Sequence, residues 1–244
     1  MTPKKKENVK TENGITDEVF EFIKNAEKTD VIKQIVCAIN NAVNEQSLQQ
    51  AKSCAAKDTG YCQTYKPLLA AGKRCKKYPS ENHIKILALA AYGWMPTIMD
   101  SVEYNARNVK QAIEHMKSVR RIDDEDAIRH FEDLSRLTNN SYVGVSKFLH
   151  FLFPASFAIF DSRIEKTLNK LCGKIKLGRK MFFPTVLPTD KTRQVECFIL
   201  YELAMRKAAK RIKKSLRDIE QVLFYYDEIN KGDKVDEPRC KAHG

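Results

Sequence analysis

The sequence predicts an all-α protein, and three observations support this fold class. Apolar residues recur every three or four positions through most of the 244 residues, whereas the alternating pattern of a half-buried strand is nearly absent. Several of these periodic segments begin just after a Thr, Ser or Asp, which is a helix start signal. Hydrophobic residues make up 43% of the chain and charged residues 30%, which is the balance of a globular protein.

The periodicity places helices along most of the chain. Thr16 is expected to cap the first helix, Asp30 the second, and Ser80 a helix that ends at Gly93. The stretch "KIKLGRKMFFPTVLP" at 174–188 has no helical pattern and is interpreted as an ordered loop. The expected helices span 17–28, 31–39, 81–93, 108–117, 124–136, 142–152, 162–171, 191–215 and 217–229.

These helices are expected to form one domain over 15–230, between a flexible leader (1–14) and a flexible tail (231–244). The longest apolar stretch, Phe148–Phe160, is too short to cross a bilayer, and the N-terminus lacks the apolar core of a signal peptide. The sequence therefore predicts a cytoplasmic protein without a membrane partner.

The net charge of +12 is concentrated in one part of the chain. Residues 163–217 hold 16 Lys and Arg against four acidic residues, which accounts for the whole excess. A field of one sign is typical of a surface that binds a polyanion, most simply nucleic acid. The alternative is a solvated helix without a partner, and a membrane surface is disfavoured because the segment lacks a wide face of bulky apolar residues. Within the basic C-terminal helices, at 190–229, the expected DNA contacts are Lys207, Lys210 and Arg211.

Seven cysteines with no CxxC pair are typical of a reducing compartment. Only Cys54, Cys62 and Cys75 lie loosely together, and a zinc site there would need a fourth ligand from elsewhere. Buried or idle thiols are the simpler interpretation, so no metal and no cofactor are expected.

The stretch "SYVGVSKFLHFLFPASFAIFDSRI" at 141–164 carries the strongest functional signal. Helix 124–136 ends in the polar "RLTNNSYVG", in which two asparagines suit left-handed turns, and a second helix follows at 142–152. After a proline, the apolar "FAIF" leads to Asp161 at the start of another helix. A carboxylate at an N-cap is common and needs no further role. Its place between an apolar run and the basic field that begins at Arg163 favours a functional role.

The order of these motifs resembles the helix-hairpin-helix DNA glycosylases from Glu132 to about Leu171. Together, "AAYGWMPTI", "SKFLHFL", "DSRI" and "LRDIEQVLF" look most similar to bacterial 8-oxoguanine-glycosylase-like proteins, a group that also resembles enzymes removing modified bases from phage DNA. The resemblance implies two helical lobes with a cleft for DNA and the base between them. It also implies a hairpin that grips the DNA backbone. The expected contacts of this hairpin are Asn140, Gly144 and Ser146.

The resemblance places the chemistry on two residues of a hairpin and catalytic region at about 124–171. Asp161 matches the catalytic aspartate of the family, and Lys147 matches the Schiff-base lysine of its bifunctional members. A carboxylate stabilises the positive charge that develops on the sugar and orients the attacking water. A deprotonated lysine can instead attack C1′ and open a strand-cleaving AP-lyase route. For Lys147, a phosphate contact or a solvated lysine at a helix start is an equal alternative.

Other side chains have one functional and one structural interpretation. Trp94 and Tyr92 either stack on an extruded base or fill the gap left in the duplex, or they pack in the core. Arg163 is expected to contact a phosphate, and the structural alternative is a bridge to the neighbourhood of Glu165. His150 lies within an apolar helix and is interpreted as a core histidine rather than a general acid.

The sequence thus predicts a DNA glycosylase that flips a damaged or modified base out of duplex DNA, in repair or in defence against phage, without an obligatory protein partner. The alternative is a DNA-binding protein without catalysis, which uses the basic helical face and binds in a salt-dependent way. A metal-dependent nuclease is disfavoured, because the acidic run "DDED" at 123–126 is typical of a helix N-terminus.

Overall fold

In the computed structural model the chain is almost entirely helical, which confirms the predicted all-α class. The structure describes residues 12–93, 104–119, 121–173, 175–177, 180–181 and 190–231. Its helices are α1 (Glu12–Lys28), α2 (Val31–Ala42), α3 (Glu45–Lys57), α4 (Thr59–Lys77), α5 (Glu81–Tyr92), α6 (Ala106–Ser118), α7 (Glu125–Leu137), α8 (Tyr142–Leu152), α9 (Ser162–Cys172), α10 (Lys191–Ile212), α11 (Leu216–Phe224) and α12 (Tyr226–Ile229). Two short antiparallel strands, β1 (Lys176–Leu177) and β2 (Lys180–Met181), lie in the stretch that was expected to be a loop.

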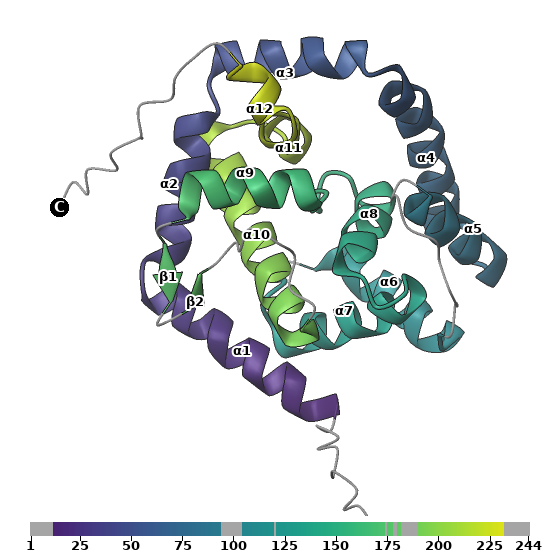
Figure 1. Cartoon of the computed structure of the whole chain (residues 1–244). Coiled ribbons are helices and arrows are strands. Elements are labelled where there is room, and N and C mark those ends of the chain that lie inside the picture. The colour runs from purple at the N-terminus through teal and green to yellow at the C-terminus, as the bar shows by residue number, and fades with distance from the viewer. Residues whose placement is uncertain are drawn as a thin grey trace, which may run out of the picture.

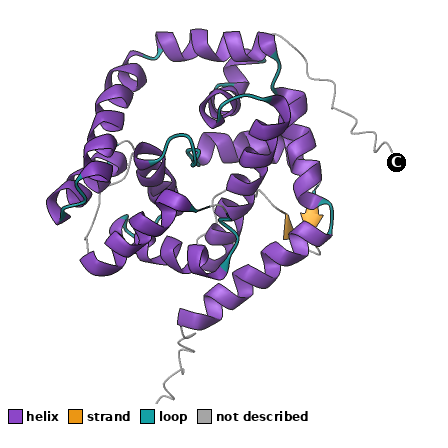
Figure 2. Ribbon diagram, turned by 180° about the vertical axis from the view of Figure 1, so that it is seen from behind, coloured by secondary structure: helices purple, strands orange, loops and turns teal. Residues whose placement is uncertain are grey.

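The first seven helices run in order around the outside of the molecule (Figure 1). α3 lies along one edge, α4 and α5 along the next, and α6 and α7 opposite α3, while α1 packs against α7 and closes the ring. The central helices α8, α9 and α10 lie inside this ring, and the view from behind shows the same enclosure (Figure 2). The enclosure explains why every residue of 195–205 in α10 is buried.

Buried apolar side chains form one continuous core that draws on α1 through α11. Its centre is aromatic: the Phe131 ring of α7 meets the rings of Phe157 and Phe198 edge to face, at 6.4 and 5.1 Å between centroids. This cluster fixes α7 and α10 around the segment that follows α8. Among the described helices, none is long and apolar enough to span a membrane.

Local capping signals predicted several helix boundaries correctly. The side-chain oxygens of Ser80, Asp124 and Asp161 accept backbone amides at the starts of α5, α7 and α9. Gly93 ends α5, as its position ahead of a proline indicated.

Other boundaries differ from the prediction. α1 begins at Glu12, so Thr16 lies inside the helix and does not cap it. The backbone amides that follow Thr16 donate to carbonyls of the preceding helical turn and need no cap. Asp30 precedes α2 in a left-handed conformation (φ 47°) and its side chain makes no cap hydrogen bond. α10 ends early because Lys213 turns the chain with φ 55°. The stretch 43–79, to which the sequence analysis assigned no helix, holds α3 and α4.

Candidate functional site

An extended segment at 157–160 connects α8 to α9 through the interior of the protein, and its residues are all buried. Buried backbone groups need hydrogen-bond partners, and an extended segment cannot supply its own. Here side chains from α8, α10 and α11 accept its amides. The three hydrogen bonds run from Ala158 N to Glu202 Oε1 (3.0 Å), from Ile159 N to Glu220 Oε2 (3.2 Å) and from Phe160 N to Ser146 Oγ (3.0 Å).

Side chains also donate hydrogen bonds to the carbonyls of this segment. The Tyr201 hydroxyl donates to the Ile159 carbonyl at 2.7 Å, and Nδ1 of His150 donates to the Phe157 carbonyl at 2.8 Å. Ser146 Oγ also lies 3.0 Å from the carbonyl oxygen of Phe160. Side chains from three helices therefore determine where this segment ends, and it ends at Asp161.

Asp161 is the N-cap of α9, in extended conformation (φ −143°, ψ 175°). Its Oδ1 accepts the amides of Arg163 and Ile164, both at 3.0 Å. The structural role that the sequence analysis kept open for this aspartate is thus confirmed. Among the described residues, Oδ2 accepts no hydrogen bond, so one carboxylate oxygen stays available to a ligand.

Lys147 is only 6% exposed, which excludes the solvated lysine considered from the sequence. Burial lowers the pKa of its ammonium group, and the negative charges of Asp161 and Glu220 oppose that shift. The structure therefore places Lys147 within electrostatic reach of Asp161 and of a second carboxylate, Glu220 of α11. A lysine in such surroundings is neutral more often than an exposed one.

Two buried glutamates accept the amides of the segment before Asp161. Burial raises the pKa of Glu220 to about 7 against the opposing charge of Arg217. Burial also raises the pKa of Glu202 to about 8, with Arg206 opposing the shift. The sequence analysis did not identify either residue, although a glutamate inside the apolar run "CFILYELAM" of α10 is a signal that could have been found.

His150 is fully buried and has partners on both ring nitrogens. Its Nδ1–H donates to a backbone carbonyl, so Nε2 accepts from the Tyr65 hydroxyl at 2.7 Å. Burial lowers the pKa of His150 to about 3, so its ring is neutral at physiological pH. The interpretation as a core histidine is confirmed.

The turn between α7 and α8 is a tight hairpin. Asn139 and Asn140 take left-handed conformations (φ 54° and 56°), as predicted for this asparagine pair. A Cβ atom on Gly144 would lie 2.7 Å from the Cβ of Thr138, so only glycine lets α8 approach the turn this closely. Tyr92 of α5 is buried, and its hydroxyl accepts a hydrogen bond from Asn139 at 3.3 Å.

The residues expected to touch DNA or the base have different environments. Gly144 and Ser146 are buried in the packing of the hairpin, so Ser146 holds the backbone of the extended segment rather than facing solvent. Asn140 and Arg163 are exposed, and the Arg163 guanidinium lies over the Phe224 ring at 4.7 Å. Trp94 lies outside the described residues.

Several basic side chains of 163–217 interact with acidic side chains of the protein itself. Three arginines of this region interact with glutamates that are almost fully buried. The pairs are Arg193 with Glu196 (2.8 Å), Arg206 with Glu202, and Arg217 with Glu220.

Lys207 also has a partner, because its Nζ lies 3.5 Å from Glu27 of α1. Lys210 and Arg211 are exposed near the end of α10. In the described part of the chain, no contact joins these three residues to Asp161 or Lys147. The surface charge of this region is therefore smaller than the sequence indicated.

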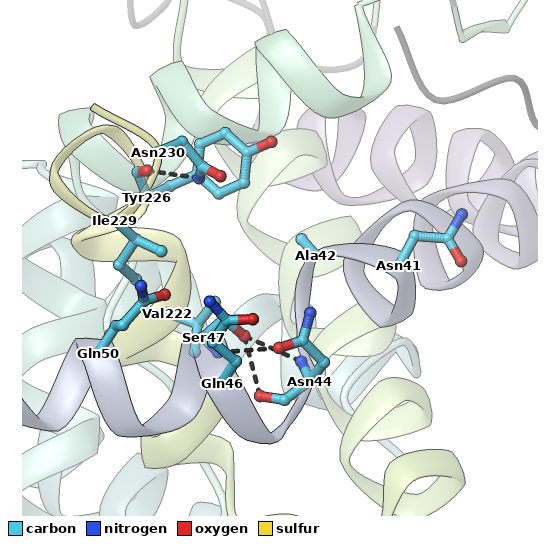
Figure 3. A pocket seen from close by; sticks show the side chains of 10 residues that line it. All are labelled: Asn41, Ala42, Asn44, Gln46, Ser47, Gln50, Val222, Tyr226, Ile229 and Asn230. Atoms are coloured by element: carbon cyan, nitrogen blue, oxygen red, sulfur yellow. Dashed lines mark hydrogen bonds between the residues drawn. The ribbon is translucent and has the colours of Figure 1, made fainter. Parts of the chain in front are cut away.

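A separate pocket lies where the turn between α2 and α3 meets α11 and α12 (Figure 3). It has a volume of about 170 Å³ and is rich in carboxamides, including Asn41, Gln50 and Asn230. Asn44 and Ser47 in its wall already bond each other in a capping box. Neither Asp161 nor Lys147 lines it.

Within the described residues, no group of three or more His, Cys, Asp or Glu side chains is arranged to hold a metal ion. Comparison with models of protein families, with curated proteins and with solved structures gives no match to this chain.

Proposed function

We propose that this protein is a DNA glycosylase of the helix-hairpin-helix type, which flips a damaged or modified base out of DNA and cleaves its N-glycosidic bond. The observation that carries the proposal is a buried lysine, Lys147, on the helix after a tight hairpin, within electrostatic reach of the Asp161 carboxylate at the start of α9. The excision would serve repair or defence against phage with modified DNA.

In this proposal Asp161 acts on the sugar. Cleavage of the glycosidic bond builds positive charge at C1′, which an ionised carboxylate stabilises while it orients the attacking water. The two amides on Oδ1 fix the carboxylate group, and Oδ2 remains to face the sugar or the water. The rigid backbone of 157–160 keeps this oxygen in one position, which favours catalysis because little reorganisation is then needed.

In this proposal Lys147 makes the enzyme bifunctional. Its neutral amine attacks C1′ and forms a C–N bond, while the glycosidic bond breaks and the base leaves with the electron pair and is protonated. Ring opening then yields an imine, from which the DNA strand can be cleaved. Glu220 is close enough to stabilise the ammonium form, and the same carboxyl can accept its proton.

The hairpin before α8 is proposed to bind the DNA backbone. The first amides of a helix have no partners within the helix and attract phosphate. The exposed Asn140 and Arg163 lie on either side of the candidate site in the sequence and are proposed as neighbouring phosphate contacts. Trp94 is kept as the proposed wedge or base-stacking residue of a cleft between two lobes, whereas the buried Tyr92 is proposed to support the hairpin.

The second candidate is a DNA-binding protein without catalysis. One observation favours it: two hydrogen bonds at the N-cap already give Asp161 a structural role. Such a protein needs no lysine of lowered pKa beside that carboxylate, which is why the glycosylase is proposed first.

The test is incubation of the purified protein with genomic DNAs, unmodified and heavily modified, followed by labelling of abasic sites and a borohydride trap. Abasic sites are expected from at least one DNA, together with a trapped adduct that is lost in Lys147→Gln. Salt-dependent binding without base release from any DNA would overturn the glycosylase and favour the second candidate.

A further inference from the structure

Helix α4 carries a second cluster of positive charge, separate from the one in 163–217. Between Thr59 and Ser80 the chain has five basic residues and no acidic one. All five are exposed, and none forms an ion pair with an acidic side chain in the described part of the chain. They are Lys66, Lys73, Arg74, Lys76 and Lys77, here called the α4 basic face.

The helical period aligns three of these lysines. Lys66, Lys73 and Lys77 are separated by seven and four residues, which returns each to the same side of the helix. At 1.5 Å per residue the row is about 16 Å long. The opposite side of α4 is buried through Leu68 and Cys75, so the row faces away from the core.

The α4 basic face is fixed to the helix that bears Lys147. A Cβ atom on Gly72 would overlap the carbonyl of Phe151, so the backbones of α4 and α8 are in direct contact there. Tyr65 of α4 bonds His150 of α8 at 2.7 Å, and the Lys76 ammonium lies 4.9 Å from the centre of the Phe153 ring just after α8. Figure 1 shows α4 beside α8 at the rim of the ring.

We propose that the α4 basic face binds the sugar–phosphate backbone of DNA beside the nucleotide that enters the site. A row of charges of one sign along a straight helix suits a polyanion with regularly spaced charges. The identification of this polyanion as DNA rests on the proposed function. A membrane surface fits less well, because Tyr78 is the one large apolar residue of 66–78 that is strongly exposed.

The experiment compares two triple variants that remove the same charge. Lys66→Gln/Lys73→Gln/Lys77→Gln changes the α4 basic face, and Lys24→Gln/Lys28→Gln/Lys33→Gln is the control, at three exposed lysines of α1 and α2. Both are made in the Asp161→Asn chain, so that base release does not alter the DNA. Fluorescence anisotropy gives Kd for a labelled duplex at several salt concentrations.

The α4 variant is expected to bind at least about tenfold more weakly at low salt and to lose about 2–3 units of the slope of log Kd against log salt, at about 0.9 per phosphate contact. The control is expected to lose less than about one unit of slope. Unchanged binding by the α4 variant, equal losses in both variants, or equally tight binding of polyglutamate would overturn the proposal. Because the readout is binding, a protein that binds through α4 but releases no base would refute the glycosylase alone.

Discussion

Two helices of this protein begin in the same way and differ in what precedes them. Asp124 caps α7 and Asp161 caps α9, each through Oδ1. Asp124 follows a turn in which the exposed Arg121 pairs with Asp123 at 2.8 Å. Asp161 follows a buried extended segment and lies beside the buried Lys147. The hydrogen bonds of the cap explain both aspartates, but they do not explain the surroundings of Asp161.

The difference shows that helix capping depends on neighbouring residues, whereas the position of a capping carboxylate within the fold depends on distant parts of the chain. Any short polar side chain can satisfy the first amides of a helix. Holding 157–160 in the interior requires Ser146, Glu202 and Glu220, which lie up to 61 residues away from the groups they bond. Such buried polar groups are stabilising only when each has its partners.

The largest expected effect is on the segment before Asp161. Glu220→Ala leaves the Ile159 amide and the Arg217 guanidinium without their carboxylate, and is expected to lower the free energy of unfolding by about 3–5 kcal/mol. Asp123→Ala, before the other cap, is expected to lower it by less, about 1–2 kcal/mol, because the Arg121 guanidinium that loses its partner is exposed to water. Urea unfolding measures the loss of stability in both variants. Equal losses would mean that the segments before the two helix starts contribute equally to stability.

A smaller effect is expected at Ser146. Ser146→Ala leaves the buried Phe160 amide without an acceptor, and is expected to lower the free energy of unfolding by about 1–3 kcal/mol. Ser53→Ala in α3 is the control, since Ser53 is an exposed serine within a helix. A loss below about 0.5 kcal/mol for Ser146→Ala in thermal unfolding would contradict the role assigned to it.

The smallest effect is on pH dependence. The pKa of Glu202 is raised to about 8 and that of Glu220 to about 7, so both bind protons more tightly in the folded chain than in the unfolded one. Between pH 4.5 and 8 unfolding releases these protons, and stability therefore falls as pH rises through this window. Glu202→Gln keeps an oxygen that accepts the Ala158 amide, and it is expected to reduce the fall in Tm between pH 4.5 and 8. If Tm of the variant falls with pH as much as Tm of the native protein, Glu202 is ionised across this range.

The sequence predicted the local features of the fold well. The caps at Ser80 and Asp161 and the left-handed pair at 139–140 depend on a few neighbouring residues and were found, whereas Thr16 and Asp30 were wrongly predicted as caps. It did not predict α4, because Pro67 and Gly72 are normally helix breakers. Gly72 lies in this helix because the Phe151 backbone packs against it, a contact across 79 positions of sequence that no local pattern reveals.

The candidate site shows the same limit. Asp161 and Lys147 could be named from motifs, and Glu202 left a signal as a lone acid in an apolar run. Glu220 could be found only from the fold. The sequence also assigned the basic surface to 163–217, because it does not show that Arg193, Arg206 and Arg217 face buried glutamates. Net charge along a chain is therefore a weak guide to surface charge when buried acids are present.

The most direct test of the central claim compares the two caps in one assay. Asparagine caps a helix about as well as aspartate, so Asp161→Asn and Asp124→Asn should each change the free energy of unfolding by less than about 0.5 kcal/mol. Single-turnover base release is then measured on the DNA from which the native protein removes a base. A loss of about a hundredfold or more is expected for Asp161→Asn, and the native rate is expected for Asp124→Asn. Equal rates for the two variants would show that Asp161 is a helix cap and nothing more.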